Sequence, residues 1–131
     1  MKLFNKIFRK KTPKIIDATG EHKVTLSGRP PEKGSECLGA PAGIDPKTNM
    51  HKDYWVLSKE ERAKGFIRPV REEYTHLVCG TDTRMNLAIA ETYARNPKFY
   101  GSTYCVHCKN HFPVGENGQF VWKGTKDKVG V

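Results

Sequence analysis

The sequence lacks the long apolar stretches that membrane insertion and export require. No hydrophobic run in the 131 residues approaches the about 20 apolar residues that a membrane-spanning helix needs. The first residues, MKLFNKIFRKKTPK, also lack the apolar core and the small-residue cleavage site of a secretory signal. We therefore expect a cytoplasmic protein with no transmembrane segment.

Cysteine is scarce, with 4 residues in the chain. Without an export signal, these thiols are expected to meet a reducing cytoplasm, where they remain free to bind metal and disulfides are rare. Cys105 and Cys108 are separated by two residues, so both thiols can reach one metal ion from a tight turn. Cys79 ends a predicted strand and supplies a third ligand. Cys37 has no Cys or His at ligand spacing, and we interpret it as an incidental free thiol.

Three histidines are candidates for the fourth metal ligand. His111 suits the turn that follows Cys-x-x-Cys, whereas His107 lies inside that motif, where its side chain tends to point away. His76 lies three residues before Cys79, and on one strand this odd separation would turn the two side chains to opposite faces. The prediction is a closed structural Zn²⁺ site formed by Cys79, Cys105, Cys108 and His111, with His107 and His76 as the alternatives.

Several catalytic motifs are missing. A thiol-disulfide oxidoreductase needs its first Cys at a helix N-terminus, and Pro113 and Gly115 oppose a helix after Cys105 and Cys108. A c-type haem site needs His directly after the second Cys, where this chain has Lys109. The His-x-Glu and Pro-Cys-x-x-Cys motifs of zinc deaminases are absent. We predict a protein that is not an enzyme, and redox chemistry at Cys105 and Cys108 is the least favoured alternative.

Acidic residues are absent from the first 14 positions, although the chain has 23 basic and 14 acidic residues and a net charge of +9. Apolar residues interleave with the cations of this arm, so it could form an amphipathic helix on phosphate or on an anionic lipid surface, or remain solvated. The favoured interpretation is nucleic-acid binding. The predicted contact residues are Lys2, Lys6, Arg9, Lys10, Lys11 and Lys14.

Three regions are predicted along the chain: a basic arm at 1–14, an irregular Gly- and Pro-rich segment at 15–52, and a zinc-binding domain at 53–131. Within the irregular segment, only 23–26 resembles a strand. In the domain, Ser58 and Glu61 form a capping box that begins a helix of about two turns. Strands are predicted at 74–78 and 99–104, and the main buried helix at 84–96, capped by Asp82 or Thr83.

A hairpin is predicted at residues 112–122. A three-residue loop closed by Gly118 would pair Val114 with Phe120 and Phe112 with Trp122, so that all four apolar side chains share one face. The predicted fold class is therefore α+β. It is a small zinc-stapled domain, similar to a zinc ribbon or knuckle, with one main helix packed on a short antiparallel sheet or hairpin.

Three segments of the chain resemble a family of small uncharacterised phage and prophage proteins. They are YWVLSKEERAKGFIRPVR, the CGT at 79–81 and ETYARNPKFYGSTYCVHCKNHFPVGENGQFVW, and the resemblance covers roughly residues 53–131. It implies phage or prophage origin, a location in the host cytoplasm or in the virion, and little about mechanism. The alternative to nucleic-acid binding is therefore a structural or protein-interaction role, as a virion component or an inhibitor of a host factor.

Overall fold

The structure is a computed structural model that describes residues 15–16, 22–34 and 39–131. The basic arm and Cys37, for which the sequence suggests a nucleic-acid contact and a free thiol, lie outside these ranges. The described residues form a small mixed fold of mostly short strands with two helices. None of these helices has the length and apolar character needed to cross a membrane.

One antiparallel sheet is built from the N-terminal half of the chain. It has the order β2 (Ile15–Ile16), β3 (His22–Thr25) and β4 (Trp55–Leu57). In the register, Lys23 lies opposite Leu57 and Thr25 opposite Trp55. The strand predicted within the Gly- and Pro-rich segment is thus present, and it pairs with a buried strand 30 residues further along the chain.

The two helices begin at side-chain caps. The Ser58 hydroxyl accepts a hydrogen bond from the backbone N–H of Glu61, which starts α1 (Lys59–Arg62), a helix of one turn. The longer helix, α2 (Leu87–Arg95), begins at Asn86, whose side chain accepts from the N–H of Ala88. The prediction that this helix starts at Arg84 under an Asp82 or Thr83 cap is wrong, because those residues form strand β6 (Asp82–Arg84).

Strand β5 (Glu73–His76) is the centre of a second sheet, between β6 and β9 (Phe120–Trp122). A separate two-stranded sheet joins β7 (Ser102–Cys105) to β8 (Asn110–Pro113). The predicted hairpin at 112–122 is therefore wrong: Phe112 lies opposite Thr103, and Trp122 lies opposite Tyr74. The four apolar side chains of that prediction nevertheless reach the same core, with Phe120 and Trp122 buried in it and Phe112 and Val114 packed against it.

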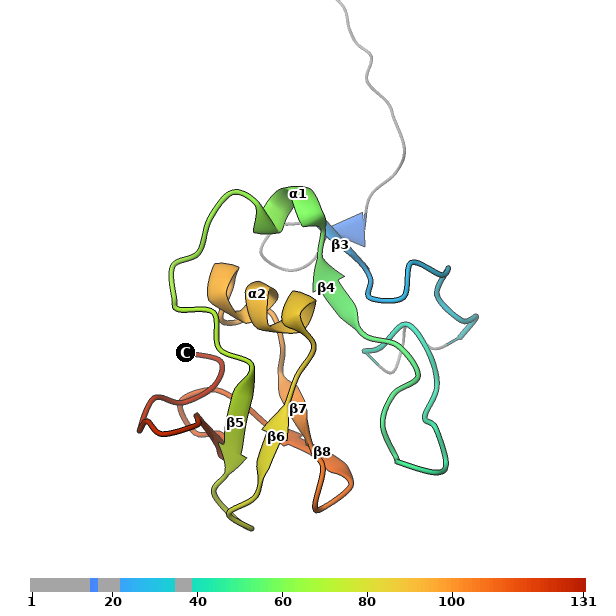
Figure 1. The fold of residues 1–131 in the computed structure, drawn as a ribbon. Helices are drawn as coiled ribbons and strands as arrows, with labels where there is room; N and C mark the ends of the chain where they lie inside the picture. Colours follow the sequence, from blue (N-terminus) through green and yellow to red (C-terminus); the bar gives the residue numbers. More distant parts are fainter. Residues whose placement is uncertain (1–14, 17–21, 35–38) are drawn as a thin grey trace, which may run out of the picture.

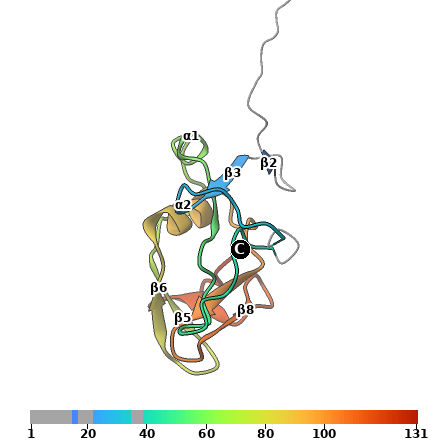
Figure 2. The ribbon, with the colours of Figure 1, turned by 90° about the vertical axis from the view of Figure 1, so that its right-hand side faces the viewer.

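The core joins α2 to the second sheet. The Tyr93 ring on α2 meets Trp122 edge-on at 5.7 Å between centroids, and Tyr74 meets Phe120 in the same way at 5.3 Å. On the other side, the Thr92 hydroxyl accepts from the Leu57 N–H at 3.1 Å, which ties α2 to β4. In Figures 1 and 2, α2 accordingly lies between β3 and β4 at one end of the molecule and β5, β6 and β8 at the other.

Residues 39–54 are a loop segment that packs on the β7–β8 sheet. The Asn49 amide donates to the Lys109 carbonyl at 2.8 Å, and the Tyr104 hydroxyl donates to the Thr48 carbonyl. The Tyr54 hydroxyl lies 2.9 Å from the Nε2 of His111. The segment is thereby attached to the strands that carry two of the predicted metal ligands.

Candidate metal centre

Two β-hairpins supply the candidate site through turns of the same form. β5 ends at His76, and the Gly80 N–H donates back to the His76 carbonyl at 2.7 Å. β7 ends at Cys105, and the Lys109 N–H donates back to the Cys105 carbonyl at 2.8 Å. Gly80 and Lys109 both have positive φ, at 77° and 53°. Each turn therefore presents its first and fourth residues on the same side.

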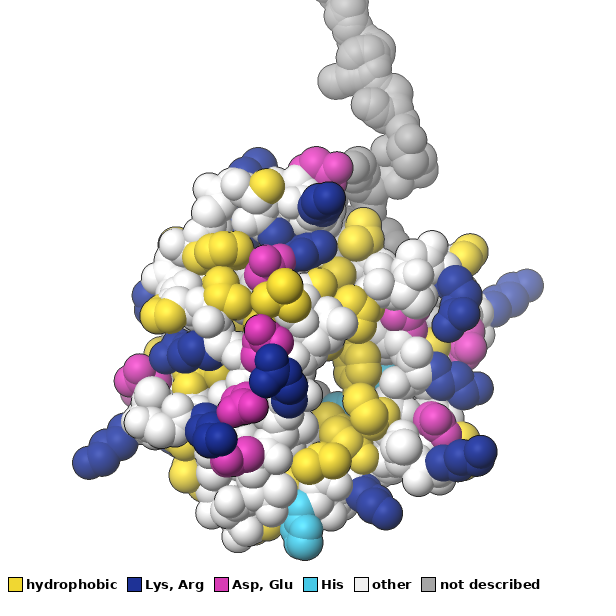
Figure 3. All heavy atoms as spheres, viewed as in Figure 1, with side chains coloured by type: hydrophobic (Ala, Val, Ile, Leu, Met, Phe, Trp, Pro, Cys, Tyr) yellow, Lys and Arg dark blue, Asp and Glu magenta, His cyan; other side chains and the backbone are white. Residues whose placement is uncertain are grey.

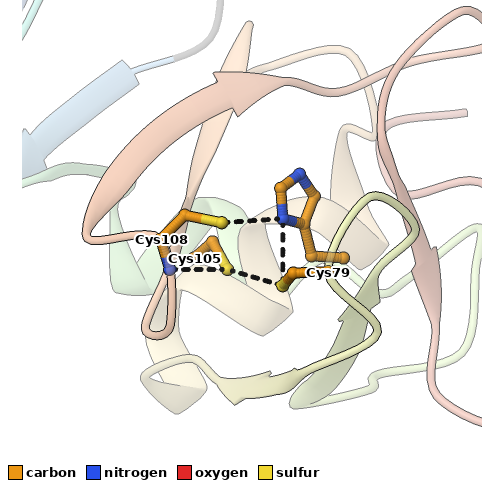
Figure 4. A group of neighbouring side chains, drawn as sticks. Cys79, Cys105 and Cys108 are labelled. Atoms are coloured by element: carbon orange, nitrogen blue, oxygen red, sulfur yellow. Dashed lines mark hydrogen bonds between the residues drawn. The ribbon is translucent and has the colours of Figure 1, made fainter.

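Four side chains converge where these turns meet: His76, Cys79, Cys105 and Cys108 (Figure 4). Their ligand atoms all lie within 4.8 Å of one another. The Cys79 sulfur is 3.4 Å from Nδ1 of His76 and 3.6 Å from the Cys105 sulfur, and the Cys108 sulfur is 3.6 Å from the same Nδ1. A disulfide requires about 2.05 Å between sulfurs, so these cysteines are free thiols.

These separations fit a tetrahedral metal site. With metal–sulfur bonds of about 2.3 Å and metal–nitrogen bonds of about 2.0–2.1 Å, ideal tetrahedral edges are about 3.8 Å between sulfurs and about 3.6 Å between sulfur and nitrogen. Three of the six distances between ligand atoms, at 3.4 to 3.6 Å, are within 0.2 Å of these edges, and the others are no longer than 4.8 Å. The four atoms are therefore close enough together to hold one divalent ion.

The imidazole of His76 is held in the orientation that metal binding needs. Its Nε2 lies 2.8 Å from the side-chain oxygen of Gln119, which can only accept, so Nε2 carries the proton and Nδ1 presents its lone pair to the sulfurs. The ring is stacked between Phe112 and Phe120, at 4.6 and 4.7 Å between centroids, and is 1% exposed. Both the tautomer and the ring plane are thus set by contacts with residues outside the two turns.

The three thiols influence one another strongly. Burial raises the pKa of Cys108 to about 11, and the neighbouring Cys105 and Cys79 add to the rise. At Cys79, burial also raises the pKa, but hydrogen bonds, chiefly those from Thr81, outweigh it and hold the pKa at about 6. The neighbouring sulfurs thus disfavour the thiolate of Cys108, and a divalent cation at the centre of the cluster would offset this repulsion.

His111, the predicted fourth ligand, is not in this group, and the structure brings His76 there instead. In the β7–β8 ladder, His111 lies opposite Tyr104, whereas Cys105 lies opposite Asn110. Because side chains alternate between the faces of a sheet, His111 shares the face of Tyr104 and points away from the Cys105 sulfur. It contacts Tyr54 and the ring of His51, and burial together with His51 lowers its pKa to about 4.

His76 can join Cys79 in the cluster because Cys79 does not continue strand β5. β5 ends at His76 itself, and Cys79 lies in the turn that follows. Strand alternation does not apply across a turn, and three residues is the spacing that brings both side chains to one metal. The sequence contains a signal for this arrangement, since His76-x-x-Cys79-Gly80 has the same spacing as Cys105-x-x-Cys108 and ends in a residue suited to positive φ. His107, the other alternative, is exposed.

Cys105 does not have the setting of a redox-active thiol. It ends a strand and enters a turn, whereas a nucleophilic Cys-x-x-Cys has its first thiol at a helix N-terminus. Its side chain is fully buried, and its sulfur accepts from the Cys108 N–H at 3.5 Å. This environment suits a metal ligand better than a nucleophile.

Comparisons of the chain with protein-family models, with curated proteins and with solved structures find no match.

Proposed function

We propose that the protein is a non-enzymatic zinc-binding module that binds nucleic acid, with the metal in a structural role. The observation that carries the metal part is the convergence of three thiols and one oriented imidazole at tetrahedral distances. Thiolate and imidazole ligands in a tetrahedral set favour Zn²⁺ among the common divalent ions. Four protein ligands leave no position for water or substrate, so the metal would supply folding energy and no catalysis.

Two hairpins joined by paired turns of this kind are the arrangement of a zinc ribbon, and we propose that fold type here. Phage or prophage origin is part of the same proposal. It is supported by the resemblance of residues 53–131 to small phage proteins, and it would locate the protein in the host cytoplasm or the virion.

The nucleic-acid part of the proposal is supported by the distribution of charge. On the β5–β6–β9 sheet, cations are neutralised in ion pairs: Arg84 contacts Glu72 and Glu73, and Lys123 contacts Glu73. Exposed lysines instead occur on the 39–54 segment and on the adjoining β7–β8 turn, at Lys47, Lys52 and Lys109. Together with the six cations of the arm, these lysines would contact a phosphate backbone.

Metal analysis of the purified protein tests the first part. The protein should contain one zinc per chain after preparation under reducing conditions without chelators. Replacement of Cys108 by Ser should lower this content sharply, and Cys37→Ser should not change it. Substoichiometric zinc in the unaltered protein would contradict the proposal.

Salt dependence tests the second part. Affinity for a duplex oligonucleotide should fall with salt by about 0.9 log units per phosphate contact per log unit of salt, so six arm contacts correspond to a slope of about 5. Replacing the six arm cations by Gln in the full-length chain should remove most of this slope and leave the zinc content unchanged. An unchanged slope would move the interface to Lys47, Lys52 and Lys109.

A second candidate function is favoured by apolar side chains on the two metal-binding turns. Leu77, Val78 and Val106 are 54%, 73% and 51% exposed, and such residues beside a rigid site are typical of protein contacts. Under this alternative the protein is a virion component or an inhibitor of a host factor. Val78→Asp in the full-length chain would then abolish incorporation into the virion or inhibition of the host factor. Replacement of the arm cations would leave that activity intact.

A further inference from the structure

A pocket of about 310 Å³ lies where three parts of the chain meet. The β3–β4 pair, the loop segment 39–54 and the β7–β8 sheet each contribute to its walls. The lining includes Lys23, His51, Tyr54, Trp55, Phe99 and His111. None of the four metal-site residues lines it, and His111 lies on the face of β8 that points away from the Cys105 sulfur. The pocket is therefore separate from the metal centre.

Flat rings form much of the pocket wall. Phe99 and Tyr100 meet edge-on, at 4.8 Å between centroids and 77° between ring planes, so they offer aromatic surface in two orientations. The imidazoles of His51 and His111 lie side by side at 4.7 Å between centroids. Flat surfaces of this kind favour a planar conjugated ligand, which can stack on them, over an aliphatic chain.

Hydrogen bonds hold these rings in position. The Tyr100 hydroxyl donates to the Trp55 carbonyl at 2.6 Å, which joins the residues before β7 to strand β4. The Tyr54 hydroxyl accepts from the His51 N–H at 3.2 Å and lies 2.9 Å from the Nε2 of His111. The walls are thus fixed to one another before any ligand enters, which reduces the entropy lost on binding.

The pocket also carries positive charge. The Lys23 ammonium lies 4.7 Å from the centre of the Trp55 ring, and none of the described lining residues is acidic. Exposed lysines adjoin the lining in sequence, with Lys52 directly after His51 and Lys109 two residues before His111. Figure 3 shows basic side chains along the side of the molecule that the N-terminal loops form, at the right of the view. This charge favours an anionic ligand.

We propose that this pocket binds one unpaired base of a single-stranded nucleic acid, with the neighbouring phosphates beside Lys23, Lys52 and Lys109. The inference rests on the proposed nucleic-acid function and specifies the form of nucleic acid. A nucleotide joins a flat ring to an anion, as the pocket joins aromatic walls to a cation. A cavity of about 150 Å³ holds benzene, so about 310 Å³ has room for a base. Bases of a duplex stay paired and stacked, so they cannot enter.

Three oligonucleotide probes of about 16 nucleotides test the proposal on the zinc-loaded, full-length chain. They are a single strand, the same strand with every base removed, and the duplex of that sequence. The single strand should bind about tenfold more tightly than the abasic strand, which is the effect of one stacked base. Equal affinities for these two strands would overturn the base pocket and leave phosphate binding intact. If no probe binds, both the pocket and the proposed nucleic-acid function are wrong.

The matched variant is Phe99→Leu, which removes a ring from the wall and retains apolar volume. It should remove most of the tenfold preference for the single strand and leave the affinities for the abasic strand and the duplex unchanged. Phe66→Leu is the control, because Phe66 is 44% exposed and does not line the pocket. It should change none of the three affinities. One zinc per chain in both variants would show that each retains its fold.

A second variant fills the pocket instead of reducing its aromatic surface. Ser102 is exposed and lines the pocket, so Ser102→Trp should occupy the space and abolish the preference for the single strand. If Phe99→Leu and Ser102→Trp both kept the tenfold preference, the bases would be bound elsewhere and the proposal would be wrong.

Adenosine 5′-monophosphate distinguishes a strand from a free nucleotide. It carries a base and a phosphate but cannot reach the pocket and the basic arm together, so it should bind at least about a hundredfold more weakly than the single strand. At saturation it should shift the ring NMR signals of Phe99 and His111. An affinity equal to that of the strand would overturn the assignment to a single-stranded nucleic acid.

Discussion

Replacing His76 and His111 separately by Ala decides which histidine completes the metal site. Structural zinc sites bind with about 10–16 kcal/mol, so each of four ligands corresponds to about 3 kcal/mol, or about a hundredfold in Kd. His76→Ala should therefore weaken zinc binding about a hundredfold. His111→Ala should leave zinc affinity unchanged, because its side chain lies on the opposite face of the β7–β8 sheet.

The effect on stability follows from linkage. With free zinc buffered at a hundred times the wild-type Kd, metal binding adds about 2.7 kcal/mol to the free energy of unfolding, whereas a hundredfold weaker site retains about 0.4 kcal/mol. The zinc-dependent part of the stability should thus fall by about 2.3 kcal/mol in His76→Ala. Urea unfolding followed by Trp fluorescence, with buffered zinc and with chelator, measures this part directly.

Comparison with the chelated protein is necessary because His76→Ala also leaves a cavity between Phe112 and Phe120. His76→Cys is the matched control, since it exchanges one soft ligand for another and should retain stoichiometric metal. Cobalt substitution should show tetrahedral absorption bands in the wild type, in His76→Cys and in His111→Ala. Loss of these bands in His111→Ala, with retention in His76→Ala, would refute the assignment.

Three further predictions concern residues around the site and the core. Gln119→Leu removes the hydrogen bond that sets the His76 tautomer and should weaken zinc at least about ten-fold in competition with a chelator, whereas Gln119→Glu should not. Tyr100→Phe leaves the Trp55 carbonyl unpaired and should lower the free energy of unfolding by about 1 kcal/mol, and an unchanged Tm would contradict that hydrogen bond. The folded-state pKa of His111 is about 4, below its ordinary value of 6.5. The unfolded chain therefore binds more protons between these values, and stability should fall as the pH drops from 6.5 to 4. His111→Phe should flatten this part of the stability profile, and identical profiles would contradict the low pKa.

The three cysteines could be predicted from sequence because the information was local. Cys105 and Cys108 lie in one turn, and Cys79 follows a recognisable strand. The N-cap at Ser58 was predictable for the same reason, since its hydroxyl accepts from the backbone N–H of Glu61, only three residues further along. Structural features that depend only on residues within about five positions of one another could thus be predicted from the sequence.

Features that depend on pairing between distant strands were not predictable in this way. The predicted 112–122 hairpin placed two apolar segments in one core, but these segments do not pair with each other: β8 pairs with β7 and β9 pairs with β5. The prediction of His111 in place of His76 as the fourth ligand was wrong for a related reason. The face on which each side chain lies depends on where its strand ends and on which strand it pairs with. A slip of one residue in the pairing register reverses every such assignment.

Residues 39–54 supply none of the candidate ligands, but they are attached to the β7–β8 sheet that carries two of them. Asn49 is bonded to the backbone of Lys109, directly after Cys108, and Thr48 is bonded to Tyr104, directly before Cys105. Any loosening of the Cys105–Cys108 turn removes the surface on which this Gly- and Pro-rich segment rests. A metal bound at this site would therefore also stabilise a segment of 16 residues that supplies none of its ligands.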